Sequence, residues 1–306
     1  MYKIKVITAL LSVFVFTDLF GQEVKENKLA TKDSIKWETG FKSTLNATQV
    51  NLTNWSAGGE NSLSVTGLFH MYLNRKDDKS EWVNEIKTAY GIIKQGDTKT
   101  IKSEDVLDVL SKYGYKTKSK WYYSALFNLK TQFDQGFKDP QAEDKELVSA
   151  FMAPGYINFS LGMDYKPNKS FSLFLSPIST KTTAVLDDNI DEMQYGLDSS
   201  ETFRSELGAY LSMSYKTPLM ENVDYETKVN LYSNYLNNPF NVDINWMNLL
   251  TMKVNKYLNV NILTELIYDD DINIKDEDDD ILDNGGPKTQ FKEILSLGLT
   301  YKWDKK

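Results

Sequence analysis

The stretch Leu295-Ser296-Leu297-Gly298-Leu299-Thr300-Tyr301-Lys302-Trp303 alternates apolar and polar residues without a break. Successive side chains of a β-strand point to opposite faces, so this alternation predicts a strand with one apolar and one polar face. The apolar face ends in two aromatic residues, which is typical of the interface girdle of a membrane β-barrel. The stretch therefore predicts a lipid-facing transmembrane strand.

The same alternation recurs along most of the chain. It is equally clear from Trp121 to Lys130 and from Phe203 to Tyr215. Extending it predicts strands near residues 37–53, 61–74, 80–94, 103–116, 120–134, 150–166, 169–183, 201–216, 222–236, 240–254, 257–269 and 289–303. Residues 103–116 also fit the start of a helix, and Asn248 interrupts the alternation of 240–254. Most of these segments are longer than the roughly five to six residues of strands in soluble β-sandwiches. The sequence thus predicts an all-β fold, a transmembrane antiparallel up-and-down β-barrel of about 12 strands.

The connections between the expected strands alternate between short and long. The long segments 134–150, 184–201 and 269–283 hold 20 carboxylates and three lysines. The tight connections 74–79, 116–120, 166–169, 216–222 and 254–257 carry ten basic residues and three carboxylates. Outer-membrane barrels have short periplasmic turns and longer extracellular loops. We therefore expect an acidic extracellular end and a basic periplasmic end.

The N-terminal residues have the layout of a secretory signal peptide. Lys3 and Lys5 precede an apolar run from Val6 to Phe16, which is shorter than the roughly 20 residues that a transmembrane helix needs. We expect a signal peptide at residues 1–21, a polar periplasmic segment at 22–36 and the outer-membrane β-barrel at 37–306. This organisation predicts the cell outer membrane of a Gram-negative bacterium as the location. Outer-membrane lipid and the barrel-assembly machinery are the expected partners.

Composition argues against several classes of function. A formal net charge of −8 opposes nucleic-acid binding, which requires a basic surface. The absence of cysteine excludes a disulfide framework and a thiolate metal site. The single histidine, His70, would have to be the base of any Ser-His hydrolase, but the alternation places it on the inward polar face, in the periplasmic half of its strand. We therefore expect no enzymatic activity and no cofactor.

The acidic segment 269–283 is the one candidate for a cation site. Its nine carboxylates could bind a hard cation such as Ca²⁺, or they could form a solvated acidic loop. An EF-hand loop needs glycine at its sixth position, where counting from Asp276 gives Ile281. We assign no metal ligand to the segment.

Three segments resemble a known family. They are Asn54-Trp55-Ser56-Ala57-Gly58-Gly59-Glu60-Asn61-Ser62, Lys112-Tyr113-Gly114-Tyr115-Lys116 and Trp121-Tyr122-Tyr123-Ser124-Ala125. They are similar to the Bacteroidota outer-membrane β-barrels of the family called domain of unknown function 3078. The resemblance implies the location and the fold, and it supplies no catalytic or ligand residue.

Charged residues on the expected inward faces are the candidates for function. They are Lys42, Glu85, Lys87, Lys130, Arg204, Glu206, Glu226, Lys228 and Glu265. Burying so many ionisable groups without water or partners costs several kcal/mol each, so the lumen must contain water or ion pairs. Two functions follow. The barrel is a narrow, weakly selective channel for small solutes, or it is a non-conducting surface or assembly component that acts through its acidic extracellular loops.

Overall fold

A computed structural model describes residues 36–52, 60–274 and 286–305. Twelve long strands are β1 (Lys36–Val50), β2 (Ser62–Lys76), β3 (Ser80–Gln95), β4 (Ile101–Lys116), β5 (Trp121–Thr131), β8 (Gly155–Tyr165), β9 (Phe171–Ala184), β10 (Phe203–Met220), β11 (Val223–Asn234), β12 (Asp243–Lys253), β13 (Leu258–Tyr268) and β16 (Gln290–Lys305). The connections contain the short strands β6 (Gly136–Phe137), β7 (Leu147–Ser149), β14 (Asn273–Ile274) and β15 (Gly286–Pro287) and the 3₁₀ helix η1 (Glu192–Tyr195). In the described part of the chain, no helix is long and apolar enough to cross a membrane.

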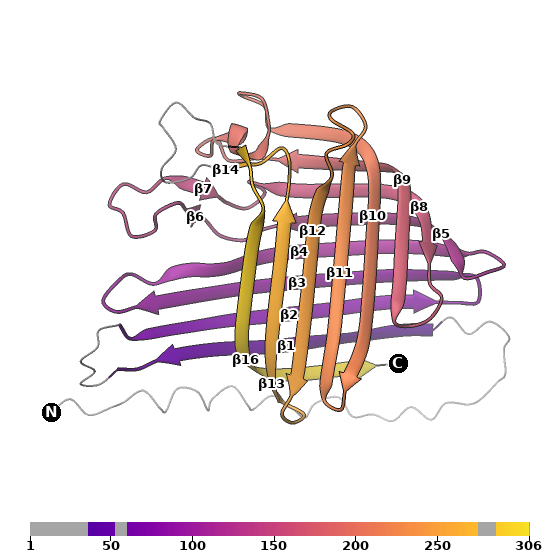
Figure 1. The fold of residues 1–306 in the computed structure, drawn as a ribbon, viewed down its shortest axis with the longest axis horizontal. Helices are drawn as coiled ribbons and strands as arrows, with labels where there is room; N and C mark the ends of the chain where they lie inside the picture. The colour runs from indigo at the N-terminus through magenta and orange to yellow at the C-terminus, as the bar shows by residue number, and fades with distance from the viewer. Residues whose placement is uncertain (1–35, 53–59, 275–285, 306) are drawn as a thin grey trace, which may run out of the picture. The chain divides into compact units, whose positions relative to one another are not determined.

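The long strands form one closed antiparallel barrel in the order β1-β16-β13-β12-β11-β10-β9-β8-β5-β4-β3-β2. Each strand therefore pairs with its neighbours in sequence, as in an up-and-down barrel, and β16 closes the ring against β1. In Figure 1 strands β1 to β5 run across the view behind β10 to β13, which run up and down. The upper part of β16 follows β13 and its lower part follows β1, so β16 turns the corner between these two groups.

The all-β fold, the barrel topology and the number of strands confirm the prediction from sequence. Residues 103–116, which also fit the start of a helix, form strand β4, and the segment 240–254, which Asn248 interrupts, forms strand β12. The sixth predicted segment, 150–166, was wrong at its start, because Ala150 to Pro154 form a turn closed by a bridge between Ala150 and Ala153. Proline has no amide proton to donate to a ladder, which explains why the strand begins after Pro154. The expected signal peptide at 1–21 and all but the last residue of the expected polar segment 22–36 lie outside the described residues.

The outward face of the barrel is apolar. Its exposed side chains include Leu45, Phe69, Tyr123, Phe127, Leu175, Phe203, Leu295, Leu297, Leu299, Tyr301 and Trp303. Because the side-chain period of a strand is two, the polar residues between them face the barrel interior. A closed ring of antiparallel strands with this apolar exterior is the architecture that satisfies backbone hydrogen bonds inside a bilayer.

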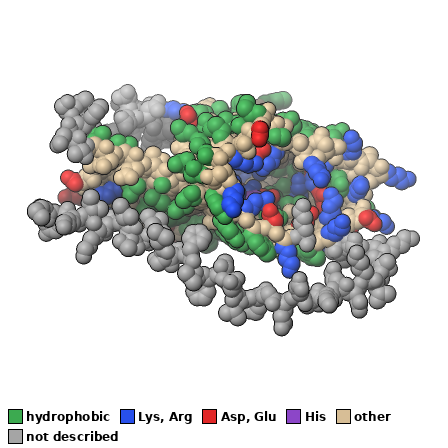
Figure 2. Space-filling model, turned by 90° about the horizontal axis from the view of Figure 1, so that it is seen from below, with side chains coloured by type: hydrophobic (Ala, Val, Ile, Leu, Met, Phe, Trp, Pro, Cys, Tyr) green, Lys and Arg blue, Asp and Glu red, His purple; other side chains and the backbone are tan. Residues whose placement is uncertain are grey.

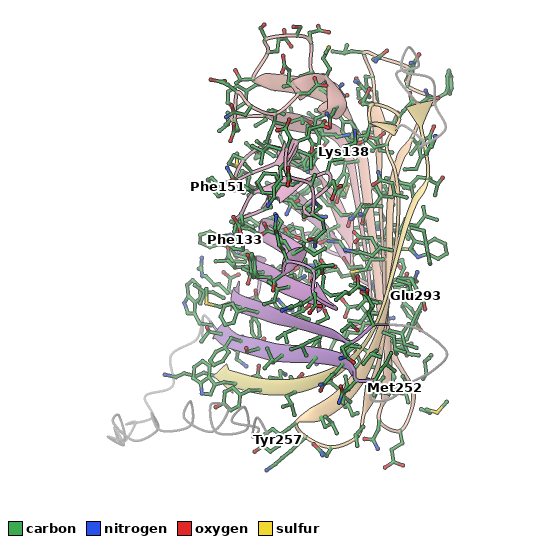
Figure 3. All side chains as sticks on the ribbon, turned by 90° about the vertical axis from the view of Figure 1, so that its left-hand side faces the viewer. Phe133, Lys138, Phe151, Met252, Tyr257 and Glu293 are labelled. Atoms are coloured by element: carbon green, nitrogen blue, oxygen red, sulfur yellow. The ribbon has the colours of Figure 1, made fainter. Side chains whose placement is uncertain are left out.

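The two ends of the barrel differ. We call outer end the one that carries the segments 132–154, 185–202 and 269–274, and inner end the one that carries the turns 77–79, 117–120, 166–170, 221–222 and 254–257. In the side view of Figure 3, Phe133, Lys138 and Phe151 lie toward the outer end, and Met252 and Tyr257 lie at the inner end. Figure 2 shows Lys and Arg side chains gathered around a hollow on the face that is seen from below.

Candidate functional site: the barrel lumen

The strand registers place all nine predicted residues on the face opposite the exposed hydrophobic side chains. Arg204 and Glu206, for example, alternate with the exposed Phe203 and Leu207 on β10. In the ladder between β9 and β10, Glu206 lies beside Lys181, which faces inward for the same reason. Their part in conducting a solute stays a prediction.

The middle of the lumen holds an acid with two basic neighbours. The carboxylate of Glu85 lies 2.7 Å from the ammonium group of Lys87 and 3.5 Å from Nε2 of His70. The side chains of Glu85 and Lys87 remain 25% and 47% exposed although both face inward. The lumen therefore leaves space at this level that solvent can reach.

One ion pair crosses the lumen near its outer half. Lys292 of β16 lies 3.3 Å from Glu265 of β13 and 3.5 Å from Glu104 of β4. Three strands separate β16 from β4 in the order around the barrel, so Lys292 links two distant parts of the wall. Asn245 also donates a hydrogen bond of 3.0 Å to Glu265.

A second network lies toward the inner end and ties β4, β8 and β3 together. Asp164, which is 1% exposed, lies 2.6 Å from Lys112 and 3.2 Å from Lys166. The hydroxyl of Ser172 donates a hydrogen bond of 3.2 Å to the same carboxylate. Lys166 also pairs with Glu81 of β3. Burial of Asp164 is tolerable because two cations and a hydroxyl surround its charge.

The other predicted residues differ in their pairing. Glu226 pairs with Lys216 across the β10–β11 ladder at 2.9 Å. Within the described part of the chain, Lys42, Lys130 and Lys228 make no ion pair within 4 Å.

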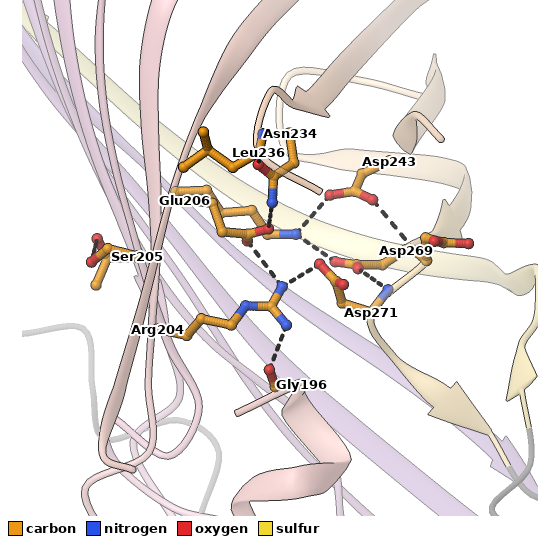
Figure 4. Close-up of polar contacts among 12 residues, drawn as sticks. Gly196, Arg204, Ser205, Glu206, Asn234, Leu236, Asp243, Asp269 and Asp271 are labelled. Atoms are coloured by element: carbon orange, nitrogen blue, oxygen red, sulfur yellow. Dashed lines mark hydrogen bonds and ion pairs between the residues drawn. The ribbon is translucent and has the colours of Figure 1, made fainter. Parts of the chain in front are cut away.

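At the outer end, two basic residues hold acidic residues of the loops; we call this cluster the latch (Figure 4). Lys181 lies 2.7 Å from Asp243 and 2.8 Å from Asp269. Arg204 lies 3.1 Å from Glu206, pairs with Asp271 and donates a hydrogen bond to the carbonyl of Gly196.

The latch fastens the loop segments 185–202 and 269–274 to the barrel wall. Asp269 and Asp271 belong to the segment after β13, and Gly196 follows η1, so two cations of β9 and β10 hold both segments over the lumen. Gly196 takes a left-handed conformation with a φ of 74°, which glycine adopts without a steric penalty. A cavity of ≈190 Å³ lined by Arg204, Glu206 and Asn234 adjoins the latch.

The loops at the outer end have a small apolar core of their own. Val185, Ile190 and Leu197 of one segment pack with Ala150 and Ala153 of another, and all five are buried. We call the two segments that share this core, 132–154 and 185–202, the cap.

Polar groups at the edges of the cap fix it in place. The hydroxyl of Tyr195 donates a hydrogen bond of 2.5 Å to the carbonyl of Val148, and burial raises the pKa of this phenol. Gln132 donates to the carbonyls of Ala150 and Ala153 at 2.7 and 2.8 Å. The cap is thus a packed structure at the outer end of the barrel.

Sequence reasoning named nine inward charges but omitted other charged residues that form ion pairs in the lumen and at the outer end. Lys112 and Lys292 occupy polar positions of the period of two, which could have found them, whereas Lys181 lies between Thr180 and Thr182, where the alternation gives no signal. Asp269 and Asp271 were assigned to an acidic loop with solvated or cation-binding carboxylates, whereas they pair with Lys181 and Arg204. Among the described residues, no group of three or more His, Asp or Glu side chains could hold a metal ion.

Comparison with known proteins agrees with the resemblance seen in the sequence. Residues 47–137 match the family model described as "Protein of unknown function (DUF3078)". The family name carries no activity to this chain. No curated protein matches the sequence.

Several solved structures are similar to the barrel at low sequence identity. The translocator domain of the autotransporter NalP from Neisseria meningitidis is 8% identical, with a TM-score of 0.39 and 89% of each chain covered. The COG4313 outer membrane channel from Pseudomonas putida F1 is 10% identical, with a TM-score of 0.40, covering 91% of this chain and 100% of that one. OmpF from Salmonella typhi is 10% identical, with a TM-score of 0.30, covering 88% and 97% of the two chains.

Proposed function

We propose that the protein is an outer-membrane channel whose narrow lumen conducts small polar solutes with weak selectivity. The observation that carries this proposal is the exposure of paired charges inside the barrel. Glu85 and Lys87 form an ion pair at 2.7 Å, yet 25% and 47% of their side chains remain accessible. A lumen packed as a solid plug would bury such side chains, so their exposure supports a water-filled path.

Weak selectivity is expected because charges of both signs line this path. Glu85, Glu226 and Glu265 neutralise neighbouring lysines, while Lys42, Lys130 and Lys228 keep an unpaired charge among the described residues. Fields from close opposite charges largely cancel, so the paired groups favour neither ion sign, and the three unpaired ammonium groups add only a weak preference for anions. An outer membrane location fits the apolar exterior with aromatic residues at the strand ends.

Planar-bilayer recording of the purified barrel tests the proposal. We expect discrete conductance steps and a reversal potential near zero under a gradient of potassium chloride. Bilayers that stay silent although correctly folded barrel has inserted would contradict the channel.

The alternative function is a non-conducting surface or assembly component. The cap favours it, because two loop segments with a shared apolar core present an ordered surface at the outer end. Silent bilayers together with a stable, folded protein would favour this alternative.

A further inference from the structure

The ladder that closes the barrel covers only part of its two strands. β1 and β16 pair from Thr39 with Lys305 to Ala47 with Leu297. Residues 290–296 of β16 pair with β13 alone, and residues 48–50 of β1 pair with β2 alone. Among the described residues, β1 and β16 therefore have no ladder between them in the outer half of this seam, where residues 48–50 of β1 and 290–296 of β16 each leave one edge unpaired.

This unpaired part lies at the level of the outer half of a membrane. Leu297 is six residues from Trp303 of the aromatic end, which corresponds to about 14 Å along the axis for a strand tilted by about 45°. The apolar band of such a barrel is about 25 Å tall. Val50, the last residue of β1 and on its inward face, is 44% exposed.

A row of polar residues on the outward face leads to the same place. The registers align Thr227 of β11, Asn248 of β12, Thr264 of β13 and Glu293 of β16 as direct cross-strand neighbours. Tyr225 donates a hydrogen bond of 2.7 Å to Asn248. The side-chain amide of Asn248 in turn donates one of 3.3 Å to Thr264.

Apolar rows flank this polar row on both sides. The rows are Val229, Trp246, Leu266 and Phe291 on one side and Tyr225, Leu250, Ile262 and Leu295 on the other. Glu293 ends the polar row between Phe291 and Leu295, which are 65% and 64% exposed. Figure 3 shows Glu293 on the side of β16 that faces away from the barrel interior.

Glu293 forms no hydrogen bond or ion pair with a described residue in this state. A carboxylate on the lipid-facing surface is unfavourable without a partner. The register identifies one: four more pairs between β1 and β16 would place Asn51 opposite Glu293. The ladder between β1 and β2, continued by one pair, would then add Asn61, so that the polar row would run on through the seam.

We propose that the outer half of the β1–β16 seam is a lateral portal through which a small amphiphilic solute passes between the lumen and the outer leaflet. The portal closes by extending the ladder until Asn51 meets Glu293. Its edge suits an amphiphile, because Lys292 and Glu293 are charged while Ile294, Leu295 and Val50 are apolar. The cap and the latch lie at the outer end, where a solute leaving along the axis would meet them, which favours a sideways exit.

Pairs of introduced cysteines test the state of the seam, since the chain contains no cysteine. Gln49→Cys with Leu295→Cys lies in the unpaired part, at positions that the extended register brings together. Leu45→Cys with Leu299→Cys is the matched control, because these residues are paired, face outward and occupy the same kind of ladder position. Under mild oxidation in native membranes we expect the control to cross-link at once and the portal pair much more slowly. Equally fast cross-linking of both pairs would overturn the portal.

Dye uptake then tests the route, which rests on the proposed channel. The probe is N-phenyl-1-naphthylamine, an apolar amine that fluoresces in lipid, added to cells that carry each variant. We expect the cross-linked portal pair to lose the dye uptake that the barrel confers and to regain it after reduction, while the cross-linked control keeps it. Unchanged uptake through the locked portal would overturn the portal. Bilayer recordings of the same variants test the proposed channel separately from the portal. Ion conductance that persists after the portal pair has been cross-linked supports the axial channel, whatever the result of the dye experiment.

Discussion

Arg204 joins its own strand β10 to the segment that follows η1 and to the segment that follows β13. Its guanidinium group lies 3.1 Å from Glu206 of its own strand and also contacts Asp271 and the carbonyl of Gly196. Guanidinium is planar and offers five donors in a fixed fork, so one side chain can serve all three acceptors. A lysine has a single ammonium group and could not reach them in the same arrangement.

Replacing Arg204 by alanine should loosen the outer mouth. Glu206 and Asp271 would lose their shared cation, so we expect the free energy of unfolding to fall by about 1–3 kcal/mol. We also expect a larger and noisier conductance, because the segments 185–202 and 269–274 would each lose a bond to the wall. Urea unfolding in lipid vesicles and bilayer recording measure the two effects.

The other arginine of the chain, Arg75, is the control for this substitution. It makes a single ion pair of 3.4 Å with Asp77 at the inner end. Arg75→Ala should change stability by no more than about 0.5 kcal/mol. Equal effects of the two substitutions would show that Arg204 does not hold the loops.

At the scale of elements, strand positions could be predicted and their contacts could not. The period of two located every long strand, because lipid on one side and water on the other select side chains at each position of a transmembrane strand. It also placed Arg204 and Glu206 on the inward face. The partner Asp271 depends on how a loop folds back over the mouth, and local alternation carries no information about that.

Asn248 shows what an exception to the alternation can mean. It stands on the outward face of β12, where the pattern calls for an apolar residue. The registers show that it belongs to a polar row whose other members come from β11, β13 and β16. Each member looks like an isolated irregularity in the sequence, and only the pairing of the strands reveals the row.

The ion pair between Lys112 and Asp164 should couple β4 to β8. Lys112→Met and Asp164→Leu should each destabilise the barrel by about 3–5 kcal/mol, because each leaves a buried charge without its main partner. The double variant should cost less than the sum, with a coupling energy of about 1–3 kcal/mol. Chemical unfolding of the four proteins of this cycle gives the value.

A surface pair at the outer end provides the control for that cycle. Lys138 and Glu146 lie 3.5 Å apart, and their side chains are 67% and 54% exposed. Solvent screens such a pair, so its coupling energy should be about 0–1 kcal/mol. Additive effects of the Lys112 and Asp164 substitutions would contradict a role of their ion pair in joining the strands.

At the scale of the whole molecule, the two ends have opposite character. The loop segments of the outer end are rich in carboxylates, and the tight turns of the inner end are rich in lysine. Part of the acidic charge is used inside the molecule, since Asp243, Asp269 and Asp271 pair with Lys181 and Arg204. The remaining carboxylates make the outer end a surface that attracts cations from solution.

The orientation of the barrel in the membrane follows from the same division and can be tested by labelling single cysteines. Asp144 lies in the long connection between β6 and β7, and Lys118 lies in the tight turn between β4 and β5; both are exposed. Long loops face the outside in outer-membrane barrels, so a membrane-impermeant maleimide should label Asp144→Cys on intact cells. Lys118→Cys should react only after the outer membrane has been permeabilised, because its turn faces the periplasm. The native chain has no cysteine, so each variant reports on one position. Labelling of Lys118→Cys alone on intact cells would show that the barrel has the opposite orientation in the membrane. The unpaired seam would then lie at the level of the inner leaflet, and the proposed portal would release its solute on the periplasmic side.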